Sequence, residues 1–199
     1  MGAIEDYASL IDAVDSQKDR LHGPSGEDIW GGVNAKRFRH DPNRQMEDNF
    51  EIVAGFVKPD DVFVDAGGGA GRIGLPMALR CQEVINVEPS AGMCQEFMES
   101  AEEAGIKNSS NVHANWLDSH GIAGDVVHSA NVTYFVRDIG LFVERLVASA
   151  RRRVILSSYS VPNPMHNATL FKMVYGEDQA TVPVYTHLLP VLWEMDILP

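Results

Sequence analysis

A glycine-rich bend is the part of this sequence best suited to bind a nucleotide-like ligand. It follows an apolar run at residues 62–64 and reads Asp65-Ala66-Gly67-Gly68-Gly69-Ala70-Gly71. Glycines at 67, 69 and 71 let the chain turn sharply from a strand into a helix, and a ligand can approach their backbone without meeting a Cβ atom. The N-terminus of the following helix offers free N–H groups to an anion. We therefore expect a cofactor site at this bend.

Glu88 ends the next apolar run, about 20 residues after the bend, where an acid can accept both hydroxyl protons of a ribose. Charge-assisted hydrogen bonds of this kind contribute about 1.5–3 kcal/mol each. Two cofactor classes fit this geometry. Residues 69–74 match the G-x-G-x-x-G fingerprint of dinucleotide sites, but there the first glycine falls several residues after the strand. Counted from Gly67, the motif has Asp65 directly before the turn, which would repel a pyrophosphate and suits the cationic amino-acid end of S-adenosylmethionine. The pattern favours S-adenosylmethionine over NAD.

Strands and helices alternate through much of the chain, which predicts an α/β fold with a mostly parallel, Rossmann-like sheet covered by helices on both faces. We expect strands at residues 62–66, 84–88, 112–114, 125–130 and 154–159. Helices are expected at residues 4–20, 45–56, 91–104, 138–150, 168–175 and 184–195, with one more ending near residue 79. Arg72 should lie in the first turn of that last helix. The run Arg151-Arg152-Arg153 should form a charged helix end that flanks the fifth strand. We divide this single domain into an N-terminal helical lid, residues 1–58, and a Rossmann-like cofactor domain, residues 59–199.

Residues 62–160 resemble the class I S-adenosylmethionine-dependent methyltransferases in the order and spacing of their segments. Four motifs carry the resemblance: Asp65–Gly71, Val87–Ser90, Asn115–Asp118 and Ser129–Tyr134. Residues 35–39 and 187–199 are similar to segments of a poorly characterised bacterial subgroup of small-molecule type. The resemblance implies S-adenosylmethionine as the cofactor and methyl transfer as the activity.

The resemblance also implies which side chains hold the cofactor. The implied residues are Asp65, Ala66, Gly67 and Gly69 for the methionine part, Glu88 for the ribose, Asn115, Trp116 and Asp118 for the adenine, and Asn131 at the end of the fourth strand. Other interpretations stay open: Glu88 as a solvated strand end, Trp116 as a plug at the sheet edge, and Asp118 as a helix cap.

No catalytic base is assigned from the sequence. Tyr134 and His128 are weak candidates. Tyr134 follows the fourth strand but could equally pack as an aromatic lid residue. His128 lies inside an apolar strand, where a histidine is more often a hydrogen-bonded core residue. Methyl transfer depends more on in-line placement than on acid–base groups, so the lack of a base does not argue against an enzyme.

The composition restricts the partners. A net charge of −12 opposes binding to the phosphate backbone of a nucleic acid, and there is no apolar run of the length that crosses a membrane. Two cysteines, Cys81 and Cys94, have no metal-like spacing and indicate neither a metal site nor a disulfide framework, which favours the cytoplasm. We expect a small-molecule methyl acceptor. Arg37, Arg39 and Arg44 could bind an acidic small molecule or form a solvated helix face.

Residues 160–199 predict helices only, whereas similar methyltransferases complete their sheet with a hairpin of two further strands. We expect either a truncated C-terminus or a partner, such as the second copy in a homodimer, that covers the open edge. Two other functions stay open. One is a non-catalytic S-adenosylmethionine-binding module or partner subunit, and the other, less favoured, is an NAD-dependent oxidoreductase.

Overall fold

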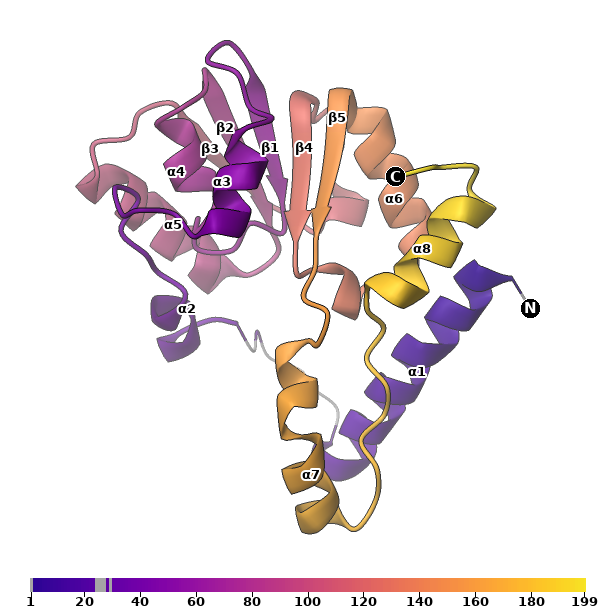
Figure 1. Ribbon diagram of the computed structural model, residues 1–199. Coiled ribbons are helices and arrows are strands. Elements are labelled where there is room, and N and C mark those ends of the chain that lie inside the picture. Colours follow the sequence, from indigo (N-terminus) through magenta and orange to yellow (C-terminus); the bar gives the residue numbers. More distant parts are fainter. Residues whose placement is uncertain (1, 24–27, 29) are drawn as a thin grey trace. The chain divides into compact units, whose positions relative to one another are not determined.

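The computed structural model describes residues 2–23, 28 and 30–199, and Figure 1 shows their arrangement in helices and strands. The chain forms two compact units. One comprises the described residues of Met1–Gly26, Asn131–Val143 and Ser157–Pro199, and the other those of Glu27–Ala130 and Glu144–Leu156. We call them the helical unit and the sheet unit.

A five-stranded sheet forms the centre of the sheet unit, in the order β3-β2-β1-β4-β5 (Figure 1). Its strands are β1 Val62–Ala66, β2 Glu83–Glu88, β3 Ser109–His113, β4 Gly124–Ala130 and β5 Ala150–Ser157. The pairs β1–β2, β1–β4 and β2–β3 are parallel, and the arrows of β4 and β5 also point the same way in Figure 1. The chain order reverses between β1 and β4, and in such sheets the crevice at the carboxyl ends of the strands is where ligands bind.

Helices α2 Val33–Arg37, α3 Asp48–Ala54, α4 Gly74–Ala78 and α5 Ala91–Glu103 belong to the sheet unit, as does the end of α6 Ile139–Ser149. The central strand β1 pairs with a neighbour on each edge, and its side chains Phe63 and Val64 are 0% exposed. Phe63 packs in one cluster with Phe50 of α3 and Met77 of α4. This packing fixes the strand ends from which the site is built.

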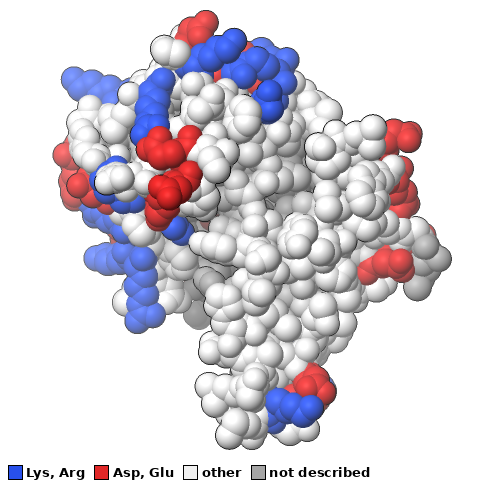
Figure 2. All heavy atoms as spheres, in the orientation of Figure 1, with Lys and Arg blue, Asp and Glu red and all other residues white. Residues whose placement is uncertain are grey.

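The helical unit contains α1 Ala3–His22, α7 Ala168–Tyr175 and α8 Tyr185–Glu194, together with the beginning of α6. Tyr7 of α1 is 1% exposed and donates a 2.9 Å hydrogen bond to the Thr133 carbonyl oxygen. None of the described side chains of α7 is buried, and the surface around α7 in Figure 2 shows few charged groups. Within the described ranges, no helix is both long enough and apolar enough to span a membrane.

Most predicted elements are confirmed, and β1 and α7 have the predicted bounds. The arginine run is a correction, because Arg151, Arg152 and Arg153 lie inside β5. Arg152 pairs with the buried carboxylate of Asp61 and donates to the Phe56 carbonyl at 3.1 Å, while Arg153 covers the Phe56 ring at 4.4 Å. β5 lies at the edge of the sheet, where charged side chains are tolerated.

Arg72 is a second correction. It lies in a turn, because α4 begins only at Gly74. Its guanidinium donates to Glu47 Oε1 at 2.7 Å and lies 5.1 Å from the Phe50 ring centre. Its carbonyl oxygen accepts a 3.0 Å hydrogen bond from Arg44. Arg72 therefore joins the residues before α3 to the end of the glycine bend.

Candidate functional site

The glycine bend has the backbone geometry that the sequence predicts. Gly67, Gly69 and Gly71 have φ angles of 74°, 57° and 84°, in the left-handed region that other residues rarely adopt. A Cβ atom on Gly71 would lie 2.7 Å from side-chain carbons of Leu75 and Phe97, so this glycine also allows the bend to pack against α5. The Gly67 N–H donates to the carbonyl oxygen of Val87 in β2 at 2.7 Å. The bend is therefore tied to the strand that carries Glu88.

Glu88 lies against the bend. Its Oε2 accepts a hydrogen bond from the Gly69 N–H at 2.9 Å and its Oε1 one from the Ser90 N–H at 2.8 Å. The side chain is 6% exposed, and this burial raises the pKa of Glu88, although the two backbone hydrogen bonds lower it. The nearby carboxylates of Asp28 and Asp65 raise it further. A buried carboxylate thus stands at the carboxyl end of β2, next to the glycine backbone.

Asp65 lies beneath the bend. Its carboxylate is 1% exposed, and Oδ1 is 3.0 Å from Nδ1 of His128, a fully buried residue in the adjacent β4. Oδ2 is buried and has no hydrogen-bond partner among the described residues. A Cβ atom on Gly68 would lie 2.7 Å from that oxygen. His128 therefore has a partner within the core, which favours a structural role over proton transfer to an acceptor.

The residues predicted for adenine follow β3. The Ala114 N–H donates to the Glu88 carbonyl at 3.2 Å, which brings this segment beside the end of β2. Asn115 caps the short helix Trp116–Asp118, because its Oδ1 accepts the Leu117 N–H at 2.9 Å. Trp116 is 5% exposed, and its Nε1 finds no hydrogen-bond acceptor in the described part of the chain. Asp118 is exposed at the end of this helix.

Asn131 and Tyr134 belong to the helical unit. Asn131 has a φ of 58°, in the left-handed region that asparagine adopts more readily than most residues with a side chain. The Tyr134 hydroxyl is 3.1 Å from Asn131 Oδ1 and 3.2 Å from Ser158 Oγ, and it accepts the Tyr159 N–H. These bonds show how Tyr134 is held in place after β4.

Sequence reasoning missed several polar side chains around the bend. Asn86, two residues before Glu88, is 0% exposed and contacts the Gly69 carbonyl. Ser90 donates to Asp28 at 2.6 Å and caps α5 by accepting the Met93 N–H at 3.2 Å. The available signal was an asparagine inside the apolar run of residues 83–88, because a buried amide needs a partner.

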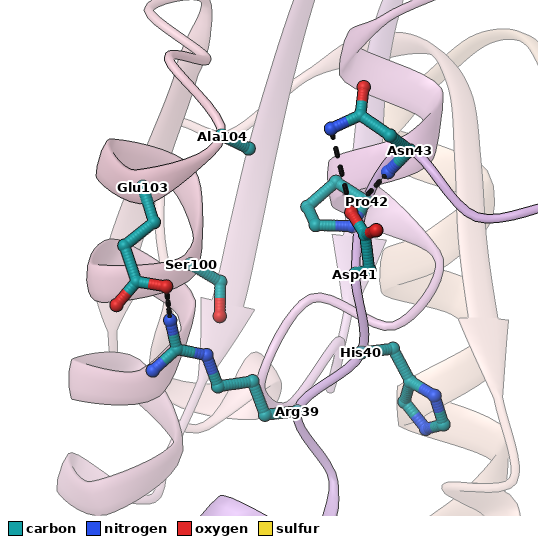
Figure 3. A pocket seen from close by; sticks show the side chains of 8 residues that line it. All are labelled: Arg39, His40, Asp41, Pro42, Asn43, Ser100, Glu103 and Ala104. Atoms are coloured by element: carbon teal, nitrogen blue, oxygen red, sulfur yellow. Dashed lines mark hydrogen bonds and ion pairs between the residues drawn. The ribbon is translucent and has the colours of Figure 1, made fainter.

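The cations before α3 do not form an open anion site. Arg39 pairs with carboxylates of α5, which raise its pKa, and Arg44 pairs with Glu47 at 3.3 Å. Arg37 is exposed at the end of α2. A hollow of about 410 Å³ lies beside Arg39, and the Ser100 hydroxyl points into it (Figure 3). It is lined by Arg39, His40, Asp41, Pro42, Asn43, Ser100, Glu103 and Ala104. Mixed charges line this hollow, and its lining includes none of the residues predicted to hold the cofactor.

Comparison with known proteins gave one curated relative and many structural neighbours. No family model matches the chain. An uncharacterised protein of Haemophilus influenzae is 27% identical over 143 residues, which cover 71% of this chain and 52% of the relative. The chain thus spans about half the length of that protein.

Solved structures resemble the chain more extensively. Magnesium protoporphyrin IX methyltransferase (ChlM) from Synechocystis PCC 6803 with bound SAH has a TM-score of 0.59 and 18% identity, covering 95% of this chain and 88% of that one. Its complex with SAM has a TM-score of 0.60 and 16% identity, with coverages of 84% and 82%. The chain has the class I methyltransferase fold. The YcgJ protein from Bacillus subtilis also matches this methyltransferase fold, with a TM-score of 0.56 and 16% identity over 73% of this chain and 66% of that one.

Proposed function

We propose that this chain is an S-adenosylmethionine-dependent methyltransferase that acts on a small-molecule acceptor. The observation that carries the proposal is the placement of Glu88: a buried carboxylate bonded to the Gly69 N–H at the carboxyl edge of a parallel sheet. A carboxylate at this place suits the two hydroxyl groups of a ribose. The ChlM structures, which have the same fold, contain SAM and SAH.

The charges around the bend favour a cationic ligand over a pyrophosphate. Asp65 and Glu88 lie below and beside the bend, and the carboxylate of Asp28 is close enough to raise the pKa of Glu88. Three carboxylates in one place repel a diphosphate and attract the positive amino-acid end of S-adenosylmethionine. This argument favours S-adenosylmethionine over NAD.

The described residues fit this cofactor. Among the residues expected to hold the cofactor, Trp116 Nε1 and Asp65 Oδ2 are buried and have no hydrogen-bond partner in the described part of the chain, and a ligand or its bound water can satisfy such atoms. We assign the cofactor to residues expected from the sequence: Asp65, Ala66, Gly67 and Gly69 for the methionine part, Glu88 for the ribose, and Asn115, Trp116 and Asp118 for the adenine. Asn131, which the sequence predicts near the methyl group, stays a prediction.

When bound, S-adenosylmethionine supplies an electrophilic methyl group on its sulfonium. The residues of the chain then hold the cofactor, exclude water and keep the acceptor in line, and such placement can lower a barrier by about 7–11 kcal/mol. The net charge of −12 favours a small acceptor over a nucleic acid. A cytoplasmic location and a homodimer stay predictions.

Calorimetry on the purified chain tests the proposal. We expect binding of S-adenosylmethionine and S-adenosylhomocysteine and no binding of NAD. Glu88→Ala should weaken the affinity for S-adenosylhomocysteine by about 1.5–3 kcal/mol, because a charge-assisted contact is lost. Glu83→Ala, at the opposite end of β2, is the matched control and should bind normally. NAD binding alone, or a Glu88→Ala variant with unchanged affinity, would overturn the assignment.

One observation favours a second candidate, a cofactor-binding module without catalysis. Both candidates for a base, His128 and Tyr134, are engaged in hydrogen bonds within their own units. A panel of candidate acceptors with labelled cofactor separates the two functions: label transfer to any of them supports the enzyme, and cofactor binding without transfer across the panel supports the module.

A further inference from the structure

A row of polar side chains crosses the sheet directly beneath the glycine bend. Four adjacent strands contribute one residue each at matching register positions: His128, Asp65, Asn86 and Asn111. His128 Nδ1 is 3.0 Å from Asp65 Oδ1, and Asn86 Nδ2 donates to Asn111 Oδ1 at 2.7 Å. The first three side chains are at most 1% exposed. The Nδ2 group of Asn86 is hydrogen-bonded, whereas its buried Oδ1 has no partner among the described residues. A buried donor is costly unless it is hydrogen-bonded, so the bonds of Nδ2 give position 86 a specific structural requirement.

The bend rests on this row. Asn86 Nδ2 also donates to the Gly69 carbonyl oxygen, at 3.2 Å. A Cβ atom on Gly68 would lie 2.2 Å from Asn86 Oδ1 and 2.7 Å from Asp65 Oδ2. Only a residue without a side chain allows the backbone to come this close to the row.

The Gly69 peptide groups are held on both sides by one strand. Asn86 binds the carbonyl of Gly69, and Glu88, two residues further along β2, accepts its N–H at 2.9 Å. Gly69 has a φ of 57°. Glycine adopts positive and negative φ angles about equally readily, so its own backbone preference does not fix the orientation of the Gly69 peptide groups. The two side chains of β2 therefore determine how Gly69 is oriented.

We propose that Asn86 is a positioning residue for the amino-acid end of the cofactor. It acts through Gly69, whose orientation it fixes, and Asn111 holds its amide in place. This inference rests on the proposed function, in which the bend receives the methionine part of S-adenosylmethionine. Asn86 should therefore matter for ligands that carry the amino-acid end and not for the nucleoside alone.

The test compares two ligands on one variant. Asn86→Leu keeps the approximate shape and removes the donor. Calorimetry measures its affinity for S-adenosylhomocysteine and for 5′-methylthioadenosine, which has the same nucleoside and no amino-acid end. We expect the dissociation constant of S-adenosylhomocysteine to rise about 10-fold or more, in keeping with a buried carbonyl left unpaired. That of 5′-methylthioadenosine should change by less than about 2-fold, since its contacts do not depend on this carbonyl.

Asn108→Leu is the matched control. Asn108 Nδ2 also donates to backbone carbonyls, those of Ala78 at 2.8 Å, Cys81 at 3.1 Å and Gln82 at 3.3 Å, but Asn108 precedes β3 and these acceptors lie outside the glycine bend. Its loss should leave both affinities unchanged. If Asn86→Leu does not fold, Asn86→Ala takes its place. The substitution can be exchanged because the readout is the ratio of the affinities for S-adenosylhomocysteine and 5′-methylthioadenosine within one variant.

Each outcome has one meaning. A selective loss of S-adenosylhomocysteine binding supports the inference. Equal losses for both ligands, or no loss in a folded variant, overturn it and leave the proposed function intact. A wild-type chain that binds neither ligand overturns the proposed function itself.

Discussion

Gly68 and Gly69 differ in what an added methyl group would meet, which allows a direct test of the packing beneath the bend. A Cβ atom on Gly68 would lie 2.2 Å from Asn86 Oδ1 and 2.7 Å from both Cγ and Oδ2 of Asp65. A Cβ atom on Gly69 would have Met93 Sδ, at 3.8 Å, as its nearest neighbour outside the adjacent residues. Gly68→Ala therefore tests crowding, and Gly69→Ala tests mainly the left-handed backbone, with a φ of 57°.

The magnitudes follow from these two causes. Overpacking a core by one methyl group costs about 1–3 kcal/mol, and displacing the Asn86 amide from the Gly69 carbonyl leaves a buried acceptor unpaired, at about 1–3 kcal/mol more. We expect Gly68→Ala to lower the free energy of unfolding by about 2–6 kcal/mol in total. Gly69→Ala should lower it by about 1–2 kcal/mol, the cost of a left-handed conformation for a residue with a Cβ atom.

Urea unfolding monitored by tryptophan fluorescence measures the free energy of unfolding of both variants. If this free energy falls with urea concentration at the same slope in both, only the stability has changed. Wild type and Gly69→Ala are the comparison proteins. A Gly68→Ala variant as stable as Gly69→Ala would refute the close contact between the bend and the polar row.

Three further predictions concern single side chains. Tyr7→Phe should lower the free energy of unfolding by about 1–2 kcal/mol, because it leaves the buried Thr133 carbonyl unpaired. In the wild type, burial raises the pKa of Tyr7 to about 12, so ultraviolet titration should show a tyrosine that ionises only near pH 12. The Arg72 hydrogen bond lowers the pKa of Glu47 to about 2, so the stability that Glu47 contributes is present above pH 4.5 and is lost as the pH falls through 2. Glu47→Gln should lower the free energy of unfolding by less than about 1 kcal/mol at neutral pH, since the pair is exposed, and by a smaller amount at pH 2. Burial raises the pKa of Glu88 above 4.5, so the folded state holds this proton more tightly and loses stability as the pH rises through the shifted pKa. When unfolding is measured at a series of pH values, the difference in the free energy of unfolding between wild type and Glu88→Gln should therefore change in that pH window. A difference that stays constant with pH would contradict the shift.

The sequence was sufficient to predict the sheet and the place of Glu88 beside the glycine bend. Residues 62–66 form a continuous apolar strand interrupted by one acid, and such a run is typical of a central strand buried on both faces. The spacing from the glycines to Glu88 correctly placed that acid beside the bend, because parallel strands end at the same edge of a sheet.

The polar row could not be predicted, because it depends on the register of four strands. Asn86 and Asn111 are 25 residues apart, and their bond requires β2 and β3 to pair in one particular register. A shift by one residue would turn each side chain to the opposite face. A single sequence does not contain this information.

The local charge pattern gave a wrong prediction at β5. Three consecutive arginines are typical of a solvated helix end, but their partners here are residues such as Asp61 and Asp125, which lie far away in the sequence. Tertiary contacts of this kind override the local preference of a segment. The same holds for Arg72, whose partner Glu47 lies 25 residues earlier.

The two anchors of Gly69 lie on one strand, and this has a consequence for protein engineering. Asn86 and Glu88 point to the same side of β2, two residues apart, and therefore move together if the strand shifts. Under the proposed function, replacing Glu88 alone to change the cofactor leaves Asn86 bonded to the Gly69 carbonyl, so half of the present arrangement of Gly69 is kept. Transferring the whole strand Glu83–Glu88 to another protein of this fold moves Asn86 and Glu88 together at their native spacing, so the strand should be exchanged as one segment.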